Sequence, residues 1–224
     1  IVAGGASRVG GNVMLSSGMG GIGSGGNIKV ISGISSNRNS GNIAISTARA
    51  TENSGSLLLG SGSSRKGRSG SIEIKTSESF IKSGDIRFTG GKSSEGTGGH
   101  ITFTTGNGEM LTSGDVKIQT GKGKSGGGSI SVLTGDSHGS GSGSLIFKTG
   151  AGKRSAGGII LRGGDSENGI GSLISIQGGT STTASGGNID IKSGISHDST
   201  SGRVQIHSSN GNAGSGNLNM GSGS

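Results

Sequence analysis

The stretches Gly26-Asn27-Ile28-Lys29-Val30 and Gly41-Asn42-Ile43-Ala44-Ile45 share one pattern: a glycine, a small polar residue, an aliphatic, a variable residue and a second aliphatic. This five-residue pattern returns about every 15 residues, in about fifteen copies that we call repeats. A disordered glycine- and serine-rich linker would scatter its aliphatic residues without a fixed spacing. The regular spacing therefore predicts an ordered repeat array.

The alternation of aliphatic and variable residues is typical of a half-buried strand, with Ile28 and Val30 on the inner face and Lys29 on the outer face. Two buried aliphatics contribute roughly 1.5 to 3 kcal/mol each, which is too little to stabilise one repeat alone. We therefore expect the repeats to stack. The predicted fold is all-β: a flattened β-solenoid of about fifteen stacked repeats of 14–15 residues.

The number of repeats in each coil stays open at this point. Two repeats per coil would let the aliphatics of successive repeats face each other, and we favour this arrangement slightly. One repeat per coil would place Glu73 beside Arg87 and Ile146 beside Ile160, which are also favourable neighbours.

Glycines and small residues surround each predicted strand. A serine or threonine such as Thr47 or Thr76 follows two residues after the second aliphatic, and a small residue such as Ser40 precedes the opening glycine. This pattern predicts steric crowding at the opening glycine. We also expect glycines to supply positive φ angles at the corners.

The repeat pattern covers residues 1–224 as a single array. Ile1 occupies the second-aliphatic position, and the chain stops at Ser224, just past a strand pattern. No polar capping repeat is visible, so we expect this array to be an excerpt of a longer one, cut inside a repeat at both ends.

The composition limits the partners that we expect. The 224 residues include 54 Gly and no Pro, Cys, Trp or Tyr, and the net charge is +8. Such a charge favours anionic partners, and anionic polysaccharide is one candidate. The charge is spread thinly and stacking aromatics are nearly absent, so we expect no nucleic-acid partner. No apolar run has the length of a membrane span.

Several short motifs resemble sites, but their context argues against them. Gly18–Gly23 matches a dinucleotide fingerprint without a following helical pattern, and Gly91-Lys92-Ser93 lacks the first glycine of a phosphate loop. Ser196-His197-Asp198 falls in a loop, where adjacency does not make a catalytic relay. The four histidines have no ligand-like spacing. We therefore predict no catalytic, cofactor or metal residues.

The Gly-Asn-Ile-x-Ile-x-Ser-Gly and Gly-Ser-Ile-x-Ile runs resemble the glycine/serine-rich solenoid arrays of long secreted surface or filament proteins of microbes and algae. The resemblance covers essentially the whole chain. It implies a structural protein, located outside the cell or on its surface, that forms or extends a fibre, filament or surface layer without catalysis. The alternatives are an ice-binding solenoid and an adhesin stalk that binds anionic polysaccharide.

Self-association is the partner interaction that we predict, end to end and laterally. Four consecutive repeats carry an outward aliphatic where most repeats have a polar residue, and apolar patches of this kind often mark interfaces. These residues, the lateral set, are Leu133, Ile146, Ile160 and Leu173.

Overall fold

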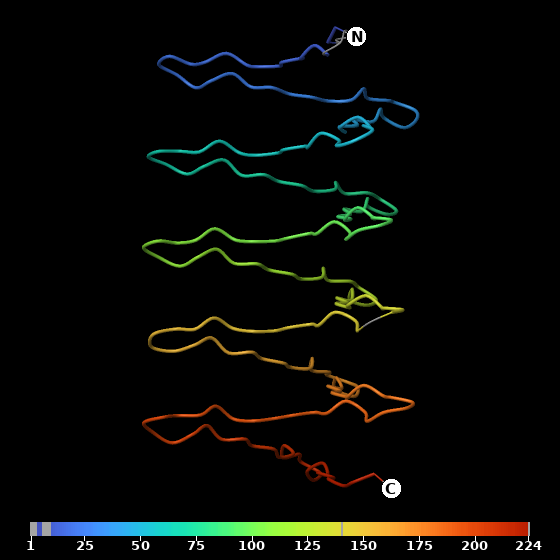
Figure 1. Ribbon diagram of the computed structural model, residues 1–224, viewed down its shortest axis with the longest axis vertical. Coiled ribbons are helices and arrows are strands. Elements are labelled where there is room, and N and C mark those ends of the chain that lie inside the picture. The colour runs from blue at the N-terminus through green and yellow to red at the C-terminus, as the bar shows by residue number, and fades with distance from the viewer. Residues whose placement is uncertain (1–3, 6–9, 140, 224) are drawn as a thin grey trace. The chain divides into compact units, whose positions relative to one another are not determined.

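The computed structural model describes residues 4–5, 10–139 and 141–223. In these residues the chain forms no helix and no strand, and it runs instead as extended segments separated by bends (Figure 1). The prediction of an all-β solenoid is therefore wrong. The choice between one and two repeats per coil falls with it, because the described residues contain no strands that could pair from one coil to the next.

The backbone hydrogen bonds explain why the extended segments do not count as strands. A β-ladder needs a series of N–H···O=C bonds between neighbouring segments. Here the described backbone bonds join the two ends of single loops or turns, as in the 2.9 Å bond from Gly26 N to Gly18 O. One bond closes each such loop, and no ladder continues from it. The alternation in the sequence thus gives extended backbone without a sheet.

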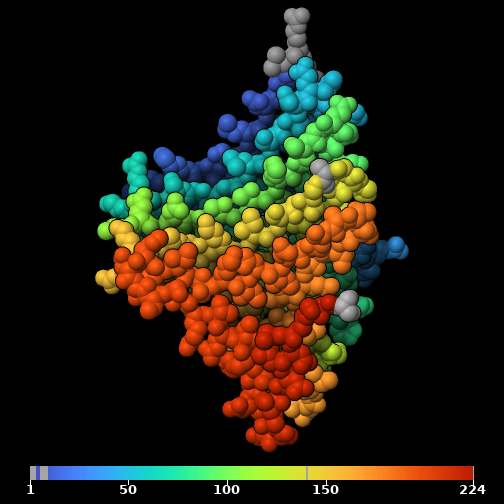
Figure 2. Space-filling model, turned by 60° about the horizontal axis from the view of Figure 1, so that its bottom comes forward, coloured from blue at the N-terminus to red at the C-terminus, as the bar shows by residue number. Residues whose placement is uncertain are grey.

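The chain leaves most of its surface in water. Its accessible surface is 23652 Å² for a mass of 21.5 kDa. A compact globular protein of this mass exposes about 9,000 Å², and the fully unfolded chain about 31,000 Å². No described side chain is buried; Figure 2 shows one face of the molecule in space-filling form. The described residues therefore form no hydrophobic core.

Exposure still follows the alternation of the repeats. The first aliphatics are the least exposed large apolar residues, with Ile86 at 46% and Ile101 at 49%. Aliphatics in the loops are almost fully exposed, with Ile34 at 96% and Ile170 at 99%. The repeat pattern therefore separates a partly shielded apolar row from an open surface.

The chain divides into two compact units, Ile1–Val116 and Lys117–Ser224, which we call the N-terminal and C-terminal halves. In the N-terminal half, one aromatic pair links consecutive repeats. The rings of Phe88 and Phe103 meet edge to face, with centroids 6.2 Å apart and planes at 87°. Such a pair contributes about 0.5 to 1.5 kcal/mol beyond the area that it covers. The second aliphatic positions of neighbouring repeats thus meet across the loop between them.

With one exception, the described glycines in the bends do not have the positive φ angles that the sequence predicts. Among the described residues, only Gly214 has a positive φ, at 126°, in a turn closed by the 3.1 Å bond from Gly214 N to Gly211 O. The expectation of positive φ at the corners in general is wrong. At some loops a glycine instead allows two backbone segments to approach each other closely, as Gly90 does beside the Gly99 oxygen.

Within the described residues, no helix is long and apolar enough to cross a membrane.

Candidate functional site

Loops that close on themselves are the most regular feature of the chain. The N–H of the residue that opens a repeat donates to the carbonyl oxygen of the residue eight positions earlier. We call these loops closed loops. The described residues contain seven of them: 18–26, 33–41, 91–99, 106–114, 164–172, 179–187 and 194–202, with N···O distances from 2.8 to 3.3 Å.

A serine hydroxyl fixes the tip of many of these loops. The serine is the third residue of the loop, and its Oγ accepts a hydrogen bond from the backbone N–H three residues later. In loop 91–99 the Gly96 N–H donates to Ser93 Oγ at 2.9 Å. The equivalent bonds of three other closed loops, all 3.0 Å long, involve Ser35, Ser181 and Ser196. Ser64 accepts the same 3.0 Å bond in loop 62–70, which is not one of the closed loops. Short side-chain to backbone bonds of this kind stabilise a bend that glycine alone would leave loose.

The neck of a closed loop, where its two ends meet, has room for at most one side chain. A Cβ on Gly114 would lie 3.3 Å from Thr105 Cβ, and a Cβ on Gly26 would lie 3.2 Å from Ser17 Cβ. In loop 91–99 both neck residues are glycine, and a Cβ on Gly90 would lie 2.6 Å from the Gly99 oxygen. The crowding that the sequence predicts at the opening glycine is confirmed.

One repeat exchanges the two neck residues. Ser172 stands where other repeats have the opening glycine, and Gly163 stands at the position of the serine or threonine. A Cβ on Gly163 would lie 3.0 Å from Ser172 Cβ. This neck therefore also holds one side chain, on the opening residue and not on the residue before the loop. Each of these necks therefore has a glycine on at least one side.

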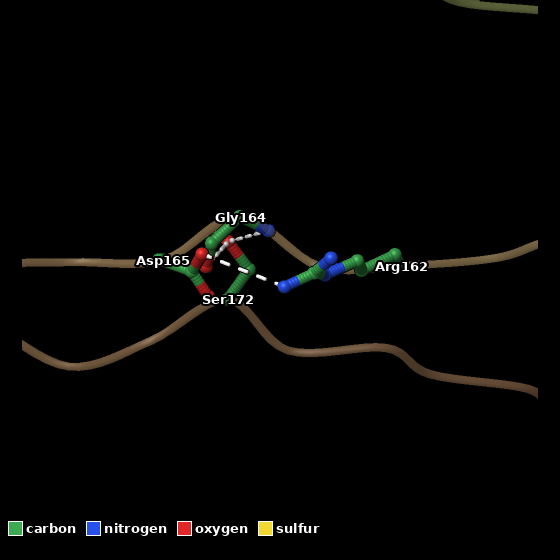
Figure 3. A network of polar contacts seen from close by, with 4 residues as sticks. All are labelled: Arg162, Gly164, Asp165 and Ser172. Carbon is green, nitrogen blue, oxygen red and sulfur yellow. Dashed lines mark hydrogen bonds and ion pairs between the residues drawn. The ribbon is translucent and has the colours of Figure 1, made fainter.

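The exchanged serine adds hydrogen bonds to its own neck (Figure 3). Ser172 Oγ donates to the Gly164 oxygen and accepts from the Gly164 N–H, both at 3.1 Å. The Ser172 N–H also donates to the Gly164 oxygen at 3.2 Å. Beside this neck, Arg162 and Asp165 form a 3.7 Å ion pair, which contributes little because both side chains are open to water.

Some charged side chains on the extended segments form ion pairs with a near neighbour in sequence. Three acids each bind the basic residue two positions later, on the same face of the segment: Glu73 with Lys75 at 3.0 Å, Asp85 with Arg87 at 3.1 Å, and Asp190 with Lys192 at 2.6 Å. Residues two apart in an extended chain lie on the same side, which explains the spacing.

Ser196 is the first residue of the Ser196-His197-Asp198 stretch that the sequence singled out. The Ser196 hydroxyl accepts from the Ser199 N–H in a loop tip. Among the described residues, no three side chains of His, Asp or Glu lie together in a way that could hold a metal ion. A surface hollow at Arg49, Ala50 and Thr51 is lined by residues of one loop alone.

The lateral set lies in the C-terminal half. Leu133, Ile146, Ile160 and Leu173 are all exposed, with fractions between 77% and 87%. Each comes from a different repeat and stands between or beside less exposed aliphatics.

Sequence reasoning missed the serine at the third position of the loops. The signal was present, because Ser35, Ser64, Ser93, Ser166, Ser181 and Ser196 all follow a glycine by two residues. This signal appears when the loops are aligned on that glycine. It is hidden when the repeats are aligned on their aliphatic residues, because the loops differ in length.

No protein-family model, curated protein or solved structure matches this chain.

Proposed function

We propose that the chain is a structural repeat protein that forms or extends an extracellular fibre, filament or surface layer by assembling with copies of itself, without catalysis. The observation that carries this proposal is the regular row of aliphatic residues that the chain does not cover. The extracellular location follows the resemblance of the Gly/Ser repeats to secreted surface arrays.

The uncovered area favours assembly over an isolated monomer. The chain exposes 23652 Å², against about 9,000 Å² for a compact protein of its mass. A standard protein–protein interface buries about 1,600 Å² from both partners together. The excess surface is therefore large enough for contacts with several neighbours.

A second copy of the same chain is the occupant that fits the repeat spacing. The exposed aliphatics stand at the same two positions of each repeat, so a partner that covers them in register needs apolar groups at the same spacing. Another copy has this spacing by construction. The lateral set extends the apolar surface of the C-terminal half beyond the two regular aliphatics of each repeat.

The test follows particle size with the full chain at rising protein concentration, by light scattering and electron microscopy. We expect growing particles with an elongated form. The double substitution Ile146→Ser and Ile160→Ser should weaken lateral bundling. Its matched control is Ile34→Ser with Ile170→Ser, because these isoleucines are more exposed but lie in loops.

Two outcomes would contradict the proposal. A chain that stays monomeric at every concentration, without visible filaments, would remove its basis. Equal loss of bundling in both double variants would show that the lateral set is ordinary surface.

A further inference from the structure

Loop 62–70 carries a concentration of positive charge. Arg65, Lys66 and Arg68 lie within four residues, all three are exposed, and the loop contains no acidic residue. In the described part of the chain, none of the three takes part in an ion pair, whereas Lys75 in the next extended segment is bound to Glu73. The cations of this loop are therefore free to meet an external anion.

The tip of the loop has a fixed bend. The Gly67 N–H donates to Ser64 Oγ at 3.0 Å, so Arg65 and Lys66 stand inside a hydrogen-bonded turn and Arg68 follows directly after it. A bend that is already formed lowers the ordering cost of binding.

Two further loops repeat this chemistry in the C-terminal half. Loop 121–127 carries Lys122 and Lys124, and loop 150–156 carries Lys153 and Arg154, again without an acidic residue. These four cations have no ion pair within the described residues either. Several cationic loops on one chain suit a ligand with many regularly spaced negative charges, because each further contact becomes intramolecular.

We propose that loops 62–70, 121–127 and 150–156 bind an anionic polysaccharide through its sulfate or carboxylate groups. Arginine forms paired hydrogen bonds with such groups, and lysine acts as a point charge beside them. The serines and glycines of the loops leave hydroxyl and backbone groups available to the sugar. These loops contain none of the regular aliphatic residues on which the proposed self-assembly rests.

The composition of the loops favours a polysaccharide over other polyanions. Single-stranded nucleic acids bind through aromatic side chains on which bases stack, and the three loops contain none. Loop 62–70 also has no apolar side chain to insert into a lipid surface.

The experiment measures the binding of the full chain to dextran sulfate, with uncharged dextran of the same length and single-stranded DNA of equal charge as comparison ligands. It is done at a protein concentration at which scattering shows only monomers, so that its result does not depend on self-assembly. We expect binding to dextran sulfate that weakens as salt is added, weaker binding to DNA, and none to dextran.

Loop 91–99 provides a matched variant, because it has the same length and the same serine-fixed bend. The triple substitution Arg65→Ser, Lys66→Glu and Arg68→Thr gives loop 62–70 the tip sequence of loop 91–99. We expect dextran sulfate to bind about tenfold more weakly. The reverse substitutions Ser94→Arg, Glu95→Lys and Thr97→Arg should strengthen binding by a similar factor.

A control with the same change in net charge separates the loop from the overall charge. Lys29→Glu, Arg38→Ser and Arg203→Thr lie outside the three loops and should change the affinity less than about twofold. An equal effect of the control would overturn the proposal, because net charge alone would then explain binding. DNA that binds as tightly as dextran sulfate would also overturn it.

Discussion

In the N-terminal half, loop 76–84 and then loop 91–99 follow two successive extended segments. The necks of these two loops close in different ways. In loop 91–99 the Gly99 N–H donates to the Gly91 oxygen at 2.9 Å. In loop 76–84 the space at Gly84 is taken by the methyl group of Thr76, 3.4 Å from where a Cβ would lie. The neck residue and the opening glycine are nine positions apart at loop 91–99, Gly90 and Gly99, and eight positions apart at loop 76–84, Thr76 and Gly84. The shorter spacing goes with van der Waals contact at the neck in place of a backbone hydrogen bond.

The difference extends to the other loops. In the shorter loops the opening glycines Gly55, Gly84, Gly128 and Gly157 all face a threonine. The closed loops have mostly serine or glycine there, and their bonds are short. The exception is instructive: Thr105 stands at the neck of loop 106–114, whose bond of 3.3 Å is the longest of the group. A threonine methyl and a short backbone bond compete for the same space.

The largest effect should come from a side chain added inside a neck in which both residues are glycine. Gly90→Ala puts a Cβ 2.6 Å from the Gly99 oxygen, which real structures do not tolerate, so loop 91–99 should open. We expect the amide hydrogen exchange of Gly99 to accelerate at least about tenfold, since a lost bond leaves the amide open to water. Gly91→Ala is the control, because no atom lies within 4 Å of its Cβ. Equal acceleration in both variants would show that the neck is not closely packed.

A double substitution tests whether one side of the neck must be glycine. Gly163→Ala alone should open loop 164–172, because its Cβ would lie 3.0 Å from Ser172 Cβ. Ser172→Gly in the same chain should restore the backbone bond to Gly164. The effects of the two substitutions on loop opening should therefore be non-additive. Chemical shifts and exchange of the residue 172 amide report the result. If the second substitution opened the loop further, the requirement for a glycine on one side of the neck would be wrong.

A smaller effect is expected from the serine at the loop tip. Ser93→Ala removes the acceptor of the Gly96 N–H, and an exposed hydrogen bond of this kind contributes about 0.5 kcal/mol. Loop 91–99 should therefore become more mobile in NMR relaxation around Gly96, while loop 76–84 stays unchanged. Ser94→Ala next to it is the control, and mobility that responds equally to both would argue against a fixed tip.

The smallest predicted change concerns the competition at the neck. Thr105→Ser removes one methyl group and should let the bond from Gly114 N to Gly106 O approach the 2.9 Å of its relatives. We expect slower exchange of the Gly114 amide by less than about threefold, because the gain is a fraction of one exposed hydrogen bond. Faster exchange would show that the methyl group supports the neck.

Part of the candidate site could be predicted from the sequence. The spacing of small residues correctly placed the crowding at Gly114 and Gly26, because a residue type without a side chain at a fixed position usually marks a close approach. The unpaired cations of loop 62–70 are also visible in the sequence, as a basic run without acids. The hydrogen bond of Ser64 was not predicted, because serine is too common in this chain for one position to stand out.

The sequence by itself determined the repeat spacing, the alternation of more and less exposed residues, the small residues at the necks and the distribution of charge. These properties depend on residues that are close along the chain. Only the tertiary structure decided that the extended segments form no sheet and that single bonds close the loops. The physical reason is that an alternating pattern indicates only which face of the chain each side chain lies on. A β-ladder also requires a neighbouring backbone segment about 4.8 Å away. No residue type encodes that distance.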